Sequence, residues 1–442
     1  MNLTDWMHRL APRAMTRRLA TVLPLAAVIV AAGCNEKLDG TAGCPLTCVD
    51  QSAQIQTVDL DAVSSAATVL GGLGLGTSPF MLLASRGDTL DTRVIIRFDS
   101  LPGVSAKSAS DTTTSTTFQY ADSVYLRLRL DSLAAKLTVP VTVSVYDVDM
   151  TTGDDTAAAV LAPLFNASRL VASTVVAPGK LVDSLAIRLP NSFLTDKAAA
   201  KARVRLGVQI SASASASARV AATQTGFGPS IVLRNYPDTV AHQPITLLPF
   251  SATPTTNSSI ASGLQDFTIV VQGTAPPAPG LLAVGGLPGR QAYLRFNVPS
   301  SIVDSALVIR ATLLLTQVPS SSPDPTDTML VQPRLVLASP LVSDPEKAAQ
   351  VLADTVQIPL SRLAALRTTP GTSGVREVEI APAFRFWAVQ PDSLLPRAIT
   401  LRSTQQDYSP QQALFYGPSA ADPTVRPKLR ISYTSRSRIG LP

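Results

Sequence analysis

Four acidic residues within one short stretch are the clearest candidates for chemistry in this sequence. Asp147, Asp149, Asp154 and Asp155 occur in Asp-Val-Asp-Met-Thr-Thr-Gly-Asp-Asp, directly after an alternating segment. Side chains two positions apart in a strand share a face, so the carboxylates of Asp147 and Asp149 would lie together, and hard oxygen ligands suit Ca²⁺. The spacing does not match an EF-hand loop, which ends in a glutamate. A structural calcium site and an ordinary acidic loop are therefore both open.

Residues for nucleophilic, redox or zinc chemistry are scarce. The 442 residues include two histidines, three cysteines and two tryptophans, whereas a zinc site takes three or four Cys, His or carboxylate ligands. His242 stands in Ala-His-Gln-Pro, far from any Gly-x-Ser-x-Gly motif, and the glycines of residues 71–76 lack the Lys-Ser/Thr pair of a phosphate loop. We therefore expect no enzymatic activity and no cofactor apart from structural calcium. A polysaccharide-degrading enzyme with paired carboxylates is the least favoured alternative, because such a pair is defined by its separation in space.

The first 33 residues have the pattern of an export signal. A basic start precedes an apolar run over residues 19–32, which is too short to be a membrane-spanning helix. The run ends in Ala-Ala-Gly-Cys at residues 31–34 and resembles a bacterial lipoprotein signal, which implies cleavage after residue 33 and a lipid on Cys34. By the same resemblance, Asn35 implies sorting to the outer membrane of the bacterial cell envelope. An ordinary buried helix is the alternative.

Removing this signal changes the charge balance. The chain has 37 Lys+Arg and 31 Asp+Glu, a formal charge of +6, and the signal holds four arginines and one aspartate, which leaves +3 for the mature chain. Beyond Arg436 and Arg438 the sequence has no Lys/Arg cluster, so we expect no nucleic-acid partner. Translation could start at Met1 or Met15, because residues 1–14 add nothing to the signal.

Residues 34–50 have the composition of a tether. They are polar and contain glycine and proline, as expected between an anchor and a folded domain. Cys44 and Cys48 lie within this stretch, separated by Pro-Leu-Thr. In an oxidising envelope they could close a small disulfide, and two free thiols are the equal alternative, because three intervening residues make a tight ring.

The rest of the chain alternates with the period of β-strands. Val124 to Leu130 and Val139 to Val145 place apolar residues at every second position, and Val94 to Phe98 is also strand-like. One face of each strand is apolar and the other is polar or carries arginine, as in a sandwich with a solvated outer side. Helical signals are short, as in Pro382 to Val389. The pattern predicts an all-β fold of antiparallel sandwiches with short peripheral helices.

An internal duplication divides the chain. Arg97-Phe98 recurs as Arg295-Phe296, and the proline-led strand at 229–233 recurs at 427–431, both with an offset of 198 residues. Leu82-Leu83-Ala84 recurs as Leu281-Leu282-Ala283 at nearly the same offset. We therefore predict two tandem modules, residues 51–240 and 262–436, with a linker at 241–261 and a tail at 437–442.

The second module resembles a known family. Its closing segments, ending in Arg426-Pro427-Lys428-Leu429-Arg430-Ile431-Ser432-Tyr433, are similar to the last strands of the DNRLRE-domain family. This resemblance covers about residues 280–433 and implies a jelly-roll fold of the group that includes carbohydrate-binding modules for alginate-like glycans, in a surface or extracellular setting. The family's Asn-Tyr-Gly segment is replaced here by Gln390-Pro391-Asp392-Ser393, and the first module has no tryptophan.

Exposed aromatic rings are the residues that sugar binding usually requires. In the second module the candidates are Tyr408, Tyr416 and Trp387, of which Trp387 has a buried core position as its alternative. We therefore expect a non-catalytic, lipid-anchored envelope protein that binds a cell-surface or environmental polysaccharide. The alternative is a structural or assembly lipoprotein that binds protein partners of the envelope.

Overall fold

The structure is a computed structural model that describes most of the chain beyond residue 54. The described residues are 55–63, 67–70, 76–87, 89–136, 138–150, 156–180, 183–252, 264–321, 326–336, 365–389 and 397–435. Cys34, Cys44, Cys48, Asp154 and Asp155 lie outside them, as do the export signal and the tether. Within the described residues, no helix is both long enough and apolar enough to cross a membrane. The described residues belong to one compact unit.

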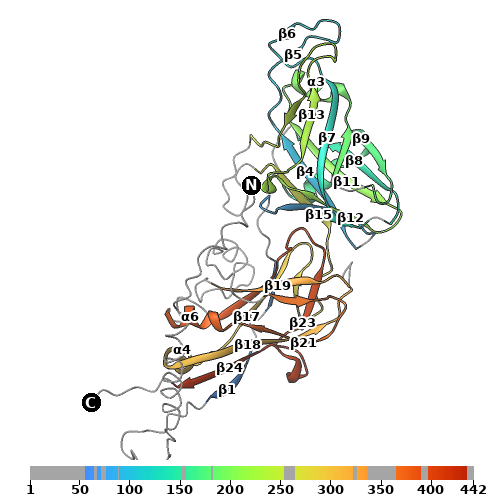
Figure 1. The fold of residues 1–442 in the computed structure, drawn as a ribbon. Coiled ribbons are helices and arrows are strands. Elements are labelled where there is room, and N and C mark those ends of the chain that lie inside the picture. Colours follow the sequence, from blue (N-terminus) through green and yellow to red (C-terminus); the bar gives the residue numbers. More distant parts are fainter. Residues whose placement is uncertain are drawn as a thin grey trace, which may run out of the picture. The chain divides into compact units, whose positions relative to one another are not determined.

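The fold is all-β, as the alternating pattern predicts, and two large antiparallel sheets dominate it (Figure 1). The first has the order β14-β13-β7-β12-β3-β4-β11-β8-β9, with β10 paired to β7 and β15 paired to β4. Its strands are β3 (Phe80–Ser85), β4 (Asp91–Phe98), β7 (Asp122–Lys136), β8 (Val141–Asp147), β9 (Leu170–Val176), β10 (Ser184–Arg188), β11 (Val204–Ala212), β12 (Ala216–Ala221), β13 (Ser230–Arg234), β14 (Ile245–Leu247) and β15 (Asp266–Gln272).

The second large sheet has the order β1-β24-β18-β23-β16-β17-β22-β19-β20, with β21 paired to β18 and β2 paired to β17. Its strands are β1 (Gln56–Asp61), β2 (Ala67–Leu70), β16 (Leu281–Gly285), β17 (Arg290–Arg295), β18 (Ala306–Val318), β19 (Met329–Leu335), β20 (Leu366–Thr368), β21 (Gly374–Glu379), β22 (Ala398–Ser403), β23 (Gln412–Tyr416) and β24 (Lys428–Ser435). The described helices are short: α2 (Ala158–Leu161), α3 (Asn191–Ala199), α4 (Ser300–Ser305) and α6 (Ala381–Val389). A separate hairpin joins β5 (Ser105–Ala106) to β6 (Thr114–Ser115).

Each large sheet folds back on itself around one apolar core, because its longest strand changes partners along its length. β7 pairs with β10 and β13 over its first half and with β12 over its second. β18 likewise pairs with β24 and β21 before it reaches β23. The apolar positions of the alternating segments, such as Val124, Leu126 and Leu128, are at most 1% exposed and face the core. Each sheet is therefore a sandwich, and its outer face carries the polar half of the alternation.

The two sandwiches have the same topology. The two sheets have the same order of strand neighbours along the chain, so each strand of the first sheet has an equivalent at the same position in the second. The two additional strands of each sheet, β10 and β15 in the first and β21 and β2 in the second, also pair with equivalent strands. Phe98 and Phe296, the aromatic residues of the repeated Arg-Phe motif, are both buried in the cores, at 0% and 1% exposure. The duplication seen as a 198-residue offset in the sequence thus corresponds to two copies of one strand plan.

The strand pairing crosses the module boundaries that the sequence predicts. β1 and β2 precede the first sandwich in the chain but belong to the second sheet, and β14 and β15 precede the second sandwich but belong to the first sheet. Figure 1 shows β1, in blue, beside the red β24. A short alternating segment can pair with any compatible sheet edge, so its sequence position does not decide which sandwich it joins.

Candidate binding surface

The outer face of β7, β10 and β13 in the first sandwich gathers basic and aromatic side chains. Arg188 of β10 lies opposite Tyr125 of β7, and the alternation of β7 places Arg127 and Arg129 on the same outer side. Phe227 follows the turn before β13 and completes the group. We call Tyr125, Arg127, Arg129, Arg188 and Phe227 the arginine face. Its three arginines and Phe227 are exposed and Tyr125 is half-buried.

Two cation–π contacts organise this face. The Arg129 guanidinium lies 4.4 Å from the centre of the Phe227 ring, which is 58% exposed. The Arg188 guanidinium lies 5.3 Å from the centre of the Tyr125 ring, and its Nη1 donates to the Tyr125 hydroxyl at 3.3 Å. Gly226, with φ +75°, turns the chain so that Phe227 is presented outward. Both rings are therefore held next to a positive charge, and Phe227 is in addition largely open to solvent.

A groove runs along this surface. It has a volume of about 420 Å³ and is lined by Arg127, Leu128, Arg129, Asp183, Ser184, Phe227, Gly228 and Ser230. A second hollow, of about 570 Å³, borders Arg188 on the side of β9. A sheet face with shallow hollows can hold an extended ligand along its length, whereas a small metabolite is usually enclosed in a deeper pocket.

The charge of the arginine face is not balanced by its own carboxylates. Arg127, Arg129 and Arg188 make no ion pair in the described part of the chain, and the described hydrogen bonds of Arg188 go to Tyr125 and Asn191. Asp183 lines the groove and forms no ion pair with another described residue. Three guanidinium groups therefore remain available to an anionic ligand, and each can bind a carboxylate or sulfate in a bidentate manner.

The equivalent face of the second sandwich is different, although the strand plan is the same. There β18 and β21 place Thr312 beside Glu379 and Leu314 beside Glu377. Arg310 pairs with Glu379 at 3.2 Å, and Arg430 pairs with Asp59 at 2.8 Å. The hydrogen bond from Arg430 lowers the pKa of the Asp59 carboxyl. Arg310 and Arg430 on this face thus have carboxylate partners, so an exposed outer face of arginines without ion pairs is not a general property of the strand plan.

In the second sandwich, Arg334 of β19 and Arg402 of β22 also make no ion pair with any residue that the structure describes. Arg402 is only 5% exposed, and Arg334 lies diagonally across from it on the same face. Burial, together with the positive charge of Arg334, lowers the pKa of Arg402 to about 10. Because Arg402 is enclosed, this pair does not offer an open surface to a polymer.

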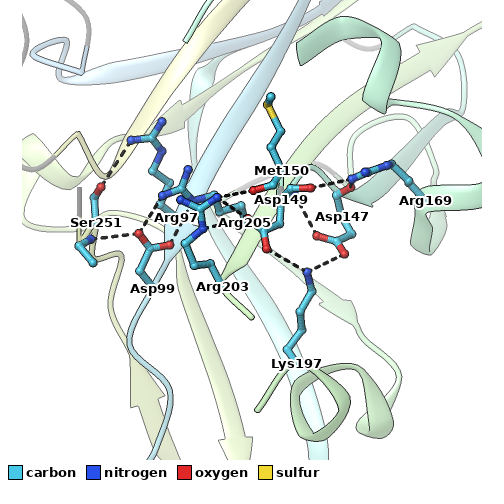
Figure 2. A network of polar contacts seen from close by, with 11 residues as sticks. Arg97, Asp99, Asp147, Asp149, Met150, Arg169, Lys197, Arg203, Arg205 and Ser251 are labelled. Atoms are coloured by element: carbon cyan, nitrogen blue, oxygen red, sulfur yellow. Dashed lines mark hydrogen bonds and ion pairs between the residues drawn. The ribbon is translucent and has the colours of Figure 1, made fainter. Parts of the chain in front are cut away.

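The acidic stretch proposed for calcium begins in a network of ion pairs, shown in Figure 2. Lys197 of α3 lies 2.7 Å from the Asp147 carboxylate and 3.6 Å from that of Asp149, and Arg203 contacts Asp149 at 3.0 Å. Arg169 donates to the backbone carbonyls of the same two aspartates. Asp154 and Asp155 lie outside the described residues, so calcium stays a prediction. It would require an ion to compete with Lys197 and Arg203 for two carboxylates that are already paired.

The aromatic candidates of the second module do not form an exposed group. Trp387 is 0% exposed in the core, where its ring packs against Phe384. It cannot stack on a sugar, so the prediction that Trp387 contributes to a glycan site is wrong. Tyr408 is half-buried, with its ring centre 5.5 Å from that of Phe80 and 5.4 Å from the Arg219 guanidinium. Burial raises the pKa of its hydroxyl. Tyr416 is half-buried at the end of β23 and stays a prediction.

Comparisons with known proteins do not assign the chain to a family. No family model matches it, and no curated protein matches it. The solved structures that match include the VP2 subviral particle of infectious bursal disease virus, at 10% identity and a TM-score of 0.11, covering 87% of this chain and 77% of that one. The Gx strain of the same virus matches at 10% identity and a TM-score of 0.11, covering 88% and 77%. Scores of this size carry no argument about fold or function.

The arginine face has a signal in the sequence that is separate from the aromatic residues of the second module. Tyr125, Arg127 and Arg129 are the outward positions of the clearest alternating segment in the chain. Outward arginines on a strand are ordinary, and only the register that places Arg188 beside Tyr125, with Phe227 under Arg129, makes them a group. That register joins segments about 60 and 100 residues away along the chain, which local patterns do not specify.

Proposed function

We propose that this chain is a non-catalytic, lipid-anchored protein of the bacterial cell envelope that binds an acidic polysaccharide through the arginine face. The observation that carries the proposal is a group of three exposed arginines that make no ion pair within the described residues, beside the exposed ring of Phe227 and the half-buried ring of Tyr125 on one sheet face. The anchor rests on the expected lipid at Cys34. The jelly-roll resemblance of the second module supports a surface setting.

The chemistry of the face suits a charged glycan. Aromatic rings stack on the apolar faces of pyranose rings, and guanidinium groups bind carboxylate or sulfate substituents. Arg127 and Arg129 are two positions apart in a strand, about 6.6–6.8 Å along its axis, so they can contact successive charges of one extended chain. Neutral polysaccharides would use only the rings and leave three charges without partners.

Affinity electrophoresis tests the proposal with the mature chain. The protein is run through gels containing a polyuronate, a sulfated polysaccharide or a neutral glucan. We expect retardation in at least one of the two acidic gels. The double variant Arg127→Gln, Arg129→Gln should lose most of this retardation.

The variant Arg310→Gln, Arg430→Gln is the matched control for charge, because it also removes two arginines, and both lie on the second sandwich and already have carboxylate partners. It should be retarded like the unaltered protein. Equal losses in the control and in the double variant would show non-specific charge attraction and contradict the proposal. Absence of retardation in every gel would leave the structural or assembly role, with a protein partner, as the better hypothesis.

The anchor is tested separately by fractionation. A Cys34→Ala variant should move from the membrane fraction to the soluble fraction, because a lipidated cysteine is the only anchor that the sequence predicts. A variant that still fractionates with membranes would refute the lipid anchor and leave the polysaccharide test unaffected.

A further inference from the structure

Both sandwiches are closed at one edge by a short strand that precedes the other sandwich in the chain. β14 pairs with β13 so that Ile245 faces Leu233 and Leu247 faces Ile231. β1 pairs with β24 so that Val58 faces Ile431 and Leu60 faces Leu429. The residues of β13 and β24 in these pairs are related by the 198-residue offset of the duplication. The two closing strands therefore occupy the same place in the same register.

The second strand of each leading segment is also equivalent. β15 pairs with β4 so that Thr268 lies opposite Val94, and β2 pairs with β17 so that Thr68 lies opposite Ala292. Val94 and Ala292 again differ by 198 residues. The Thr268 hydroxyl accepts from the backbone N–H of Leu82 at 3.1 Å, and the Thr68 hydroxyl accepts from that of Ala283 at 2.8 Å. The same side-chain contact thus fixes both strands to the neighbouring strand of their sandwich.

One backbone hydrogen bond shortly after the first strand of each pair is also equivalent. The Phe250 N–H donates to the Arg97 carbonyl at 2.8 Å, and the Val63 N–H donates to the Arg295 carbonyl at 2.9 Å. Here too the two acceptors are 198 residues apart. Three independent sets of contacts therefore show that the segment β1–β2 and the segment β14–β15 are copies of one docking element.

The order along the chain is leading pair, body, leading pair, body, and each leading pair docks on the body of the other repeat. We propose that β1–β2 is a strand donor that the second sandwich of another copy of this chain can accept, which gives a strand-exchanged dimer. A sandwich that always takes its closing strands from a different repeat can make the same contacts with a donor from a different molecule.

Exchange between copies competes with closure within one chain as the chain concentration rises. Val58 and Leu60 pack on the core of the second sandwich and Ala62 is buried there at 8% exposure, and an exchanged donor would bury the same groups. The free energy of the dimer therefore differs from that of two closed chains by two contributions. These are the entropy lost on association and the constraint that residues 71–79, which include four glycines, place on β1–β2 within one chain. An empty acceptor would instead expose the edges of β24 and β17, the kind of edge to which free strands add.

Thr57 and Ser432 provide a site-specific test. They face each other on the exposed side of the β1–β24 pair, with their hydroxyl oxygens 3.1 Å apart. The test uses the mature chain with Cys34, Cys44 and Cys48 replaced by serine. The double variant Thr57→Cys, Ser432→Cys should form an internal disulfide under oxidation.

The trans exchange is tested by mixing two single variants, Thr57→Cys and Ser432→Cys, and refolding them together before oxidation. We expect a species of twice the chain mass whose linked peptides contain positions 57 and 432. Its fraction should rise by about tenfold or more between micromolar and hundred-micromolar chain, because a flexible connection supplies an effective concentration in the millimolar range.

Arg234→Cys is the matched control, because position 234 in β13 is equivalent to position 432 through the 198-residue offset. Thr57→Cys mixed with Arg234→Cys should give no specific link. A link from position 57 to position 234 would show that β1 closes its own repeat and would overturn the assignment. An internal link in the double variant without any 57–432 dimer from the mixture, at every concentration, would overturn the exchange between copies.

Discussion

The buried ion pair between Asp99 and Arg205 allows a quantitative prediction about the first sandwich. The Arg205 Nε and Nη2 atoms donate to the two Asp99 carboxylate oxygens at 3.2 and 3.0 Å, and the two side chains are 5% and 0% exposed (Figure 2). The Ala252 N–H donates to the same carboxylate at 3.0 Å. Arg205→Met keeps most of the side-chain volume but leaves a buried carboxylate without its cation. Such a loss costs about 3–5 kcal/mol in free energy of unfolding.

Urea unfolding of the mature chain, followed by far-ultraviolet circular dichroism, measures this loss. Arg310→Met is the matched control, because its ion pair with Glu379 is 65% and 38% exposed, and exposed pairs contribute about 1 kcal/mol or less. The double variant Asp99→Leu, Arg205→Met removes both charges and should recover part of the stability, since no buried charge remains alone. The reasoning is refuted if Arg205→Met costs no more than Arg310→Met, or if the double variant loses the sum of its two single variants.

Three further predictions concern single side chains. Thr68→Val and Thr268→Val should each lose about 1–3 kcal/mol of unfolding free energy, because each leaves one backbone N–H without its acceptor; clearly unequal losses, measured by urea unfolding, would argue against equivalent docking. Phe227→Ala should reduce retardation in the acidic gel without changing the urea midpoint, since the ring is exposed; a shifted midpoint would show a structural role. Burial raises the pKa of the Asp266 carboxyl above its unfolded value, against the two hydrogen bonds from Thr223. The protonated Asp266 carboxyl therefore contributes fully to stability at low pH, and this contribution is lost as the pH rises through the folded pKa. Relative to the Asp266→Asn variant, the unaltered protein should lose free energy of unfolding between pH 4 and pH 7.

The sequence predicts the strands of this fold well where the pattern is local. Val124, Leu126 and Leu128 alternate with outward residues, and this alternation is sufficient to place β7 and its buried side. The Arg-Phe repeat is likewise sufficient to find the duplication. The partner strand of β1 is not predictable in this way, because Thr57 and Ser432 are 375 residues apart and the sequence of neither segment specifies the other as its partner. Strand partners at such separations are chosen by the available edges of the folded sheets.

The candidate site shows the same limit. Tyr408 has polar neighbours in sequence, which favours exposure, but Phe80 and Arg219 come from distant segments to cover part of its ring. Trp387 sits on an apolar helix and packs into the core, which was the alternative given for it. Arg127 and Arg129 are visible as outward residues, yet their significance depends on their place beside Arg188 and Phe227, which only the register reveals.

The pairing of β1 with β24 has a consequence for the order in which the protein is made. Because β1 is synthesised before all other described strands and β24 after them, β1 must wait unpaired until translation or export of the chain is nearly complete. Its sequence, Gln-Thr-Val-Asp-Leu-Asp, places Asp59 and Asp61 between the apolar residues. Charges at these positions disfavour pairing with stray strands, and one of them, Asp59, later becomes the partner of Arg430. Asp59 thus disfavours incorrect pairing of β1 during biogenesis and stabilises the pairing of β1 with β24 once β24 has been made.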